Sequence, residues 1–229
     1  MFFGYWDFVL IPAILVTLYA QMKVQSTYKQ YSQVQSSRGM SGADVARYIL
    51  NKNGLYDVPI EVVAGQLSDH YDPRTRVVRL SQEVYYGTSL ASLGVAAHEV
   101  GHAVQHDTGF LPLYVRNTII PVTQFGSSAA IPLFILGIFM GSESLIGLGI
   151  VLFSAIVFFQ MVTLPVEFNA SSRALATLGG EGILDAAELK GTSKVLKAAA
   201  LTYVAAALMS VMELLRLVLM SGILGGNDD

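Results

Sequence analysis

The segment that decides the fold runs from Thr118 to Leu164, TIIPVTQFGSSAAIPLFILGIFMGSESLIGLGIVLFSAIVFFQMVTL. It holds two apolar runs, 118–140 and 143–164, separated only by the short turn Met140–Ser144. Each run reaches the length of about 20 apolar residues that a helix needs to cross a bilayer. Because lipid offers no partners for backbone N–H and C=O groups, the pair predicts a tight hairpin of two transmembrane helices.

Two further apolar runs, at 3–21 and 201–224, are also long enough to cross, so about four transmembrane helices are predicted. The first carries Trp6 near one edge and Tyr19 near the other, as aromatic residues at membrane interfaces do. No basic residue precedes it, and no convincing small-x-small cleavage site follows it. These features favour a retained anchor over a signal peptide.

The composition agrees with a membrane protein. Hydrophobic residues make up 53% of the 229 residues and charged residues only 14%, against roughly a quarter in a typical soluble domain. The mean hydropathy is +0.52, which indicates that lipid takes up the apolar surface. A net charge of −3 gives no reason to expect nucleic acid. The absence of cysteine excludes disulfides and thiolate catalysis, so His, Asp or Glu must hold any metal.

Lys and Arg are concentrated in two connecting regions, with nine of the 14 in 22–117 and four in 165–200. The positive-inside rule places both regions on the cytoplasmic side and both chain ends outside. The final predicted helix, in 201–229, carries Glu213 and Arg216. Charges at that depth are costly, so these side chains, three residues apart, are expected to form an ion pair; a direct role in the chemistry is the alternative.

Region 22–117 is predicted to hold a small α+β structure. Ser41 can cap a short amphipathic helix that ends at Gly54. The β-rich runs 60–63 and 77–80 flank the turn-like SDHYDPRTR, which predicts an antiparallel hairpin. Thr88 or Ser89 can then cap a helix through LASLGVAAHEVGHAVQH.

That last helix contains His98-Glu99-Val100-Gly101-His102, which matches the metallopeptidase motif H-E-x-x-H. Side chains four apart share one face of a helix, so His98 and His102 can converge on one zinc ion. Glu99 then lies beside the metal, where it can accept a proton from the attacking water as catalytic base. A chance match is improbable in a chain with only four histidines.

Catalytic zinc needs a third protein ligand, for which several side chains compete. His106 continues the histidine series but lies about 6 Å further along the helix axis, too far to join both ligands easily. His70, like its neighbours Asp69 and Asp72, lies in the predicted turn and more plausibly contacts substrate. Glu167 directly follows a crossing and begins a helix-compatible run. We therefore favour Glu167, which gives one zinc per chain bound by two His and one Glu.

These segments resemble the YugP-like membrane zinc metallopeptidases, distant relatives of the HtpX-type membrane proteases. The resemblance covers nearly the whole chain, including the N-terminal anchor, the hairpin, SDHYDPRTRVVRLS, AAHEVGHAVQH and LPVEFNASSRAL. It implies that Glu167 matches the downstream glutamate that supplies the third zinc ligand in HtpX-type enzymes. Those relatives often carry an Asp four residues later, supporting a histidine ligand, where this chain has Ser171. Asn169, Ser171 and Arg173 remain candidates for that role, although Asn169 could instead cap local backbone and Arg173 could meet lipid phosphate.

Substrate contacts can also be proposed. Zinc proteases commonly bind an extended peptide along a strand edge, and 76–82 is the candidate edge; an ordinary structural strand is an equally good interpretation. His70 and Tyr71 could donate hydrogen bonds to the oxyanion.

The sequence therefore predicts an integral membrane protein dominated by α-helices, with about four transmembrane helices and a small cytoplasmic α+β, zincin-like insert carrying HExxH. Its organisation is a transmembrane helix at 1–21, a cytoplasmic metallopeptidase region at 22–117, a transmembrane hairpin at 118–164, a cytoplasmic helical segment with the third ligand at 165–200, and a final helix and tail at 201–229.

The expected activity is that of a zinc-dependent endopeptidase acting on peptides or membrane proteins, in quality control or processing, in a bacterial cytoplasmic membrane with its active site on the cytoplasmic side. One alternative is a non-proteolytic membrane scaffold with a structural zinc, and another is a zinc hydrolase of lipid or other amides. The sequence leaves the oligomeric state open: the hairpin glycines Gly137, Gly141, Gly147 and Gly149 could serve packing within the chain or between chains.

Overall fold

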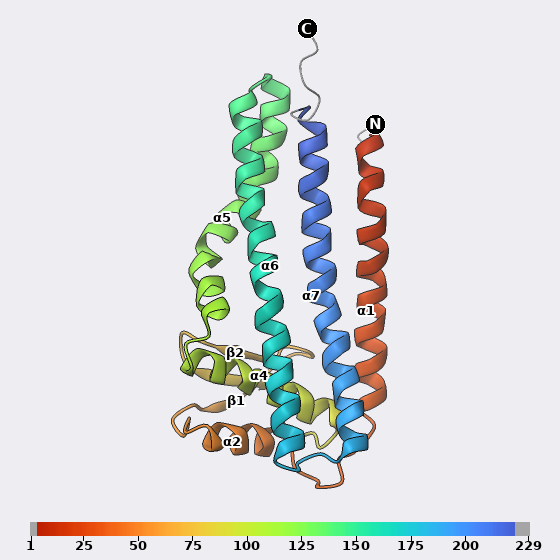
Figure 1. Ribbon diagram of the computed structural model, residues 1–229, viewed down its shortest axis with the longest axis vertical. Coiled ribbons are helices and arrows are strands. Elements are labelled where there is room, and N and C mark those ends of the chain that lie inside the picture. The colour runs from red at the N-terminus through yellow and green to blue at the C-terminus, as the bar shows by residue number, and fades with distance from the viewer. Residues whose placement is uncertain (1–3, 223–229) are drawn as a thin grey trace. The chain divides into compact units, whose positions relative to one another are not determined.

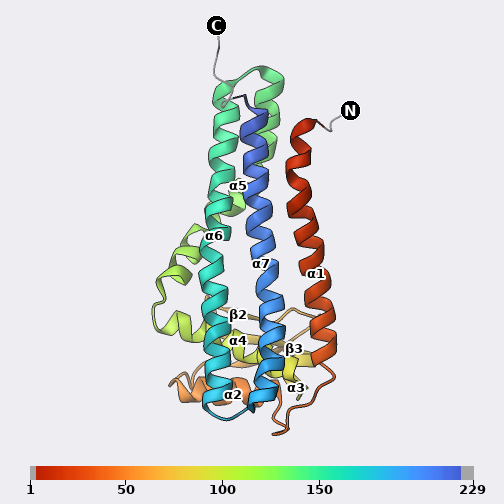
Figure 2. The ribbon, with the colours of Figure 1, turned by 45° about the vertical axis from the view of Figure 1, so that its right-hand side comes forward.

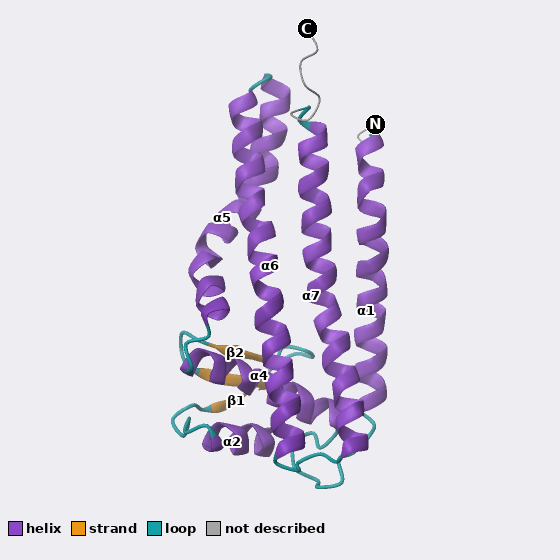
Figure 3. Cartoon of the chain, viewed as in Figure 1, coloured by secondary structure: helices purple, strands orange, loops and turns teal. Residues whose placement is uncertain are grey.

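The computed structural model describes residues 4–222, which are mostly helical with one small sheet (Figures 1 and 3). They form two compact units. The spanning unit takes in the described parts of 1–20, 115–164 and 202–229, and the site unit comprises 21–114 and 165–201. In chain order the elements are η1 (Tyr5–Leu10), α1 (Ile11–Tyr31), α2 (Gly42–Lys52), β1 (Ile60–Val63), β2 (His70–Asp72), β3 (Val77–Ser81), α3 (Gln82–Tyr86), α4 (Leu90–Asp107), α5 (Leu111–Met140), α6 (Glu143–Gly180) and α7 (Ala186–Met220).

Among residues 4–222, four helices are long and apolar enough to cross a membrane, which confirms the expected number. They are Tyr5–Tyr31, Leu111–Met140, Glu143–Gly180 and Ala186–Met220. All four are longer than the predicted crossings, most clearly the last two, because α6 and α7 continue through polar sequence without a break. Hydropathy identifies only the apolar part of such a helix.

Within the spanning unit, α5 and α6 form the predicted hairpin and lie side by side near their connecting turn (Figure 1). Phe134 of α5 and Phe153 of α6 pack in one apolar cluster with Leu217 of α7. A Cβ at Gly149 would come within 2.8 Å of the Ala130 carbonyl oxygen, and one at Gly137 within 2.7 Å of a backbone nitrogen of α6. These two glycines therefore serve packing within the chain.

The predicted ion pair is present, and it has a third member. Arg216 donates to Glu213 from Nε at 3.0 Å and from Nη2 at 2.6 Å. Its Nη1 also lies 2.6 Å from Oδ1 of Asp7 in η1. The guanidinium therefore links the first and last helices of the spanning unit. Since Asp7 is 209 residues away in sequence, local spacing could indicate only the Glu213 contact.

The sheet of the site unit corrects two expectations. Its strand order is β1-β3-β2, with β1 parallel to β3 and β2 antiparallel to it. The predicted antiparallel pairing of 60–63 with 77–80 is therefore wrong, because the segment taken as a turn contains a strand of its own, β2. The chain reverses twice between β1 and β3, which leaves them pointing the same way. β3 is consequently the central strand, so 76–82 does not supply a sheet edge; β1 and β2 do.

The helices of the site unit start at the expected caps. Ser41 accepts a hydrogen bond from the backbone of Asp44 at the start of α2, and Ser89 accepts one from the backbone of Ser92 at the start of α4. The elements α2, α3, β2 and β3 pack against α4, and Figure 2 shows them together at one end of the long helices. Their shared core includes Leu50 of α2, Leu80 of β3, and Leu93 and Val100 of α4. This packing buries most of the residues of α4.

The C-terminal part of α6 packs closely against α4. A Cβ at Gly101 would lie 2.9 Å from the backbone oxygen of Ala170, a separation that real Cβ atoms essentially never show. Ala174 and Leu178 of α6 join the same core as Val100 and Val104 of α4. Glycine at position 101 therefore lets the two backbones meet where the candidate metal ligands lie.

Candidate metal centre

The two motif histidines lie on one face of α4, as their spacing predicts. The ring centroids of His98 and His102 are 4.8 Å apart, and the ring planes are nearly perpendicular at 84°. Both side chains are largely buried. Each therefore presents a ring nitrogen to the same small volume.

Glu167 of α6 completes a group of three possible metal ligands. Its Oε2 lies 3.3 Å from His98 Nε2 and 3.7 Å from His102 Nε2, and all three ligand atoms lie within 4.8 Å of one another. Zinc binds His nitrogen and carboxylate oxygen at about 2.0–2.2 Å in tetrahedral geometry, which separates neighbouring ligand atoms by roughly 3.3–3.6 Å. The two distances from the carboxylate to the imidazoles, 3.3 and 3.7 Å, are close to this spacing, so the three residues fit a zinc ion.

Each histidine also has a partner at its other ring nitrogen. His98 Nδ1 lies 3.1 Å from the hydroxyl of Ser171, and His102 Nδ1 lies 2.9 Å from Oε1 of Gln105. Such contacts usually orient ligand histidines. Of the candidates that the sequence left open, only Ser171 touches a ligand ring directly; Asn169 and Arg173 reach His102 through Gln105.

Sequence reasoning missed Gln105, although a signal was available. It lies three residues after His102 on the same helix, which is the spacing of facing side chains. It is completely buried, as polar residues seldom are without specific partners. The spacing alone was visible in the sequence, and a glutamine one turn beyond a motif histidine is therefore worth testing as its partner.

Glu99 lies beside this group and is itself buried. Its Oε2 accepts a hydrogen bond from the backbone N–H of Tyr71 in β2, at 3.0 Å. Burial raises the pKa of the Glu99 carboxyl to about 7; His98 and the Tyr71 N–H oppose this rise, while the negative charges of Glu167 and Asp69 add to it. A carboxyl with a pKa near 7 can accept and return a proton at neutral pH.

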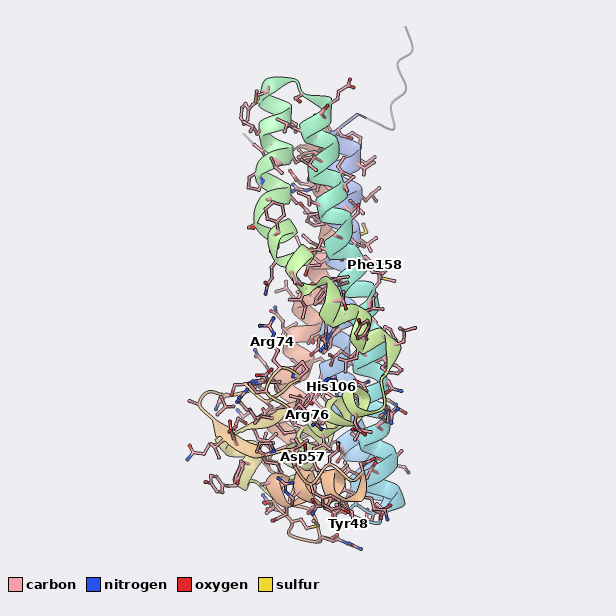
Figure 4. The ribbon with its side chains drawn as sticks, turned by 90° about the vertical axis from the view of Figure 1, so that its left-hand side faces the viewer. Tyr48, Asp57, Arg74, Arg76, His106 and Phe158 are labelled. Carbon is pink, nitrogen blue, oxygen red and sulfur yellow. The ribbon has the colours of Figure 1, made fainter. Side chains whose placement is uncertain are left out.

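The other histidines have different partners. His106 Nδ1 shares a hydrogen bond with the Tyr71 hydroxyl at 2.8 Å, and exposed His70 pairs through Nδ1 with the backbone oxygen of Ser68 at 2.8 Å. Figure 4 shows His106 on the same side of the site unit as Arg76 and Asp57, which form an ion pair at 3.1 Å. Neither histidine joins the three-ligand group. Among the competing third ligands, Glu167 is the one that lies with His98 and His102.

Asp69 and Asp72, the acidic neighbours of His70, are also occupied. Asp69 accepts from the backbone and hydroxyl of Ser81, and Asp72 accepts from Thr75 and Arg79. Both carboxylates thus fasten the loop and turn that flank β2.

The model of a family described as "putative neutral zinc metallopeptidase" matches residues 6–222. The chain belongs to this zinc metallopeptidase family. A similar protein is the "putative membrane protease YugP" of Bacillus subtilis (strain 168), 55% identical over 222 residues that cover 97% of this chain and 98% of the relative. No solved structure gives a significant match.

Family membership and geometry agree on the metal. The family is one of zinc enzymes, and the donors here are two imidazoles and one carboxylate, a set that zinc accepts in catalytic sites. The resemblance found in the sequence is confirmed.

Proposed function

We propose that this metallopeptidase is a membrane-embedded endopeptidase in which His98, His102 and Glu167 hold one zinc ion and Glu99 is the general base. The observation that carries the proposal is the convergence of the three ligand atoms within 4.8 Å, with the buried Glu99 carboxyl next in sequence to one of them. Three protein ligands leave a fourth position open, as in catalytic zinc sites.

Zinc, when bound, supplies a Lewis acid that polarises the substrate carbonyl and acidifies water. Glu99 accepts the proton of the attacking water and returns it to the departing amine. The Tyr71 N–H holds one carboxylate oxygen of Glu99 in place, which limits its rotation. No residue of the chain becomes covalently attached to substrate in this mechanism.

The edge of β2 is the proposed docking strand for an extended peptide. Tyr71 stands opposite Val78 of β3, yet its N–H donates to Glu99 and so is not used in the β-ladder. The outer edge of β2 therefore faces the catalytic base, where a peptide could add as a further strand. His70, the residue before Tyr71, is exposed and is proposed to contact substrate or the oxyanion.

Membrane proteins or membrane-bound peptides are the proposed substrates, in quality control or processing. Glu167 follows by three residues the apolar run that ends at Leu164. The distribution of Lys and Arg favours a cytoplasmic active site, and the similar protein is named as a membrane protease of a bacterium.

The alternative is a membrane scaffold that uses zinc only for structure. Structural zinc sites almost always have four protein ligands, whereas the group contains three, and they have no need of a base such as Glu99.

The test compares detergent-purified wild type with Glu99→Gln, Glu167→Ala and the control Glu181→Gln. Glu181 is a surface carboxylate bonded to Tyr48 and Lys52, so its loss tests the mere removal of a charge. Zinc content and cleavage of casein or a membrane-protein substrate are measured together. We expect Glu99→Gln to keep zinc and lose cleavage, Glu167→Ala to lose both, and Glu181→Gln to keep both. Cleavage by Glu99→Gln at the wild-type rate would exclude the mechanism.

A further inference from the structure

The amide of Gln105 is fixed in one orientation by its surroundings. Its Nε2 donates to the backbone oxygen of Val166 at 2.8 Å and to Oδ1 of Asn169 at 3.0 Å. The Val166 carbonyl can only accept, so the NH₂ group of Gln105 must face it. Oε1 must then face His102, from which it lies 2.9 Å.

Arg173 fixes the orientation of Asn169 in turn. Its Nε donates to Asn169 Oδ1 at 2.8 Å. Arginine has no acceptor, so the oxygen of Asn169, rather than its NH₂ group, must lie at this point. That oxygen then receives both the Arg173 and the Gln105 hydrogen bonds. Every donor and acceptor from Arg173 to His102 is thus determined by groups that can play only one role.

The chain of contacts determines where His102 carries its proton. Because Gln105 Oε1 is only an acceptor, His102 Nδ1 must be the protonated nitrogen. Nε2 of a neutral imidazole then keeps its lone pair. Nε2 is the atom that lies 3.7 Å from Glu167 Oε2 in the proposed metal site.

His98 lacks this constraint. Its Nδ1 partner, Ser171 Oγ at 3.1 Å, is a hydroxyl that can donate or accept by rotating its proton. The hydroxyl therefore does not select between the two tautomers of His98. The two histidines of the motif thus differ in their partners: His102 faces a group that can only accept a hydrogen bond, and His98 faces one that can donate or accept.

We propose that Gln105, oriented by Asn169 and Arg173, is a positioning residue that selects the metal-binding tautomer of His102 and thereby sets the zinc affinity of the site. The inference rests on the proposed function for the identity of the zinc ligands. It concerns binding of the metal, so its test does not depend on peptidase activity.

The test measures the zinc dissociation constant by competition with a chromophoric chelator. All variants are made in a Glu99→Gln background, where self-cleavage cannot contribute. Gln105→Met keeps the length of the side chain but removes the acceptor, and we expect its affinity to fall about 10- to 100-fold, the usual effect of losing such a partner. Gln105→Glu keeps an acceptor facing Nδ1, and we expect it to retain most of the affinity. Thermal unfolding of the metal-free variants monitors packing.

Gln105→Glu is the more damaging change for a purely structural role, since it loses both amide donors in a buried site. If Gln105→Met binds zinc as tightly as the parent, or if Gln105→Glu is as weak as Gln105→Met, the inference is wrong. Absence of zinc binding in the parent would overturn both the inference and the proposed function. If the expected affinity differences are found but the wild-type chain, with Glu99 intact, cleaves no peptide, the proposed function alone is overturned.

Discussion

Each unit of the molecule contains a cluster in which one side chain lies between two partners of opposite character, and these two clusters differ in what they can do. In the site unit, the Glu167 carboxylate lies between two imidazoles, at 3.3 and 3.7 Å. In the spanning unit, the Arg216 guanidinium lies between two carboxylates, both at 2.6 Å. Imidazoles can lose a proton and offer a lone pair to a metal, whereas a guanidinium stays protonated and has no lone pair to offer. The cluster around Glu167 is therefore suited to binding a metal ion, and the cluster around Arg216 to holding helices together.

The largest difference between the clusters should appear on removing a ligand. We expect His102→Ala to weaken zinc binding by more than about 100-fold, beyond the effect of losing an indirect partner, and to abolish cleavage. His106→Ala, one turn further along α4, is the matched control and should keep both properties. Zinc content by atomic spectroscopy and a protease assay on the purified variants check this. If His102→Ala retained zinc, the assignment of His102 as a zinc ligand would be wrong.

Loss of the Arg216 guanidinium should lower the stability of the folded protein without changing its zinc affinity. Arg216→Met leaves the carboxylates of Asp7 and Glu213 without their shared partner, and unpaired charges in this half-buried position destabilise the folded state. We expect a lower unfolding temperature in detergent with unchanged zinc affinity. The triple variant Asp7→Asn, Glu213→Gln and Arg216→Met carries no unpaired charge and should recover much of the loss. Equal destabilisation of both variants would contradict a role for the charges.

The Glu99 carboxyl should make the metal-free protein less stable at higher pH. Its folded-state pKa of about 7 is above the ordinary value of 4.5, so the folded state binds the proton more tightly than the unfolded state. The resulting stability is fully present below pH 4.5 and is lost as pH rises through 7, by about 3 kcal/mol in all. Unfolding of chelator-treated protein between pH 4 and 8 measures this, and Glu99→Gln should remove this component. An unchanged pH profile in Glu99→Gln would show that other groups are responsible.

The smallest expected effect concerns His98. Replacing Ser171 by Asp provides a carboxylate that can only accept from Nδ1, which favours the tautomer with a free Nε2. We expect zinc affinity to rise by a few-fold at most, because His98 already has a partner. Chelator competition measures the change, with Ser171→Asn as the uncharged control. A fall in affinity for Ser171→Asp would show that the present hydroxyl is the better partner.

The sequence was most informative where one helix or one apolar run carries the signal. His98, Glu99 and His102 are brought together by helical periodicity alone, and the crossings by length and hydropathy. Glu167 required more, because 65 residues separate it from His102; its place after a crossing and the family resemblance pointed to it.

The features that the sequence did not predict are a very short strand and contacts between residues far apart in the chain. β2 has three residues, His70–Asp72, too few for an alternating pattern, and it lies among residues that favour turns. Missing it reversed the direction assigned to β1 relative to β3. Likewise, nothing near Arg216 in sequence points to Asp7. The partner of His102 could have been found, since Gln105 follows it by three residues.

Gly101, one of the two unspecified positions of the motif, has a consequence for which ions can bind. Because its missing side chain lets α4 meet the backbone of Ala170, the separation of these helices also limits the distance from the two histidines to Glu167. Alanine at position 101 would force the backbones apart by some tenths of an ångström and widen the space between the three ligand atoms. The radius of the ion that fits best should increase with that separation. Gly101→Ala would therefore shift the preference of the site from zinc towards larger divalent ions, although residue 101 itself contacts no ion.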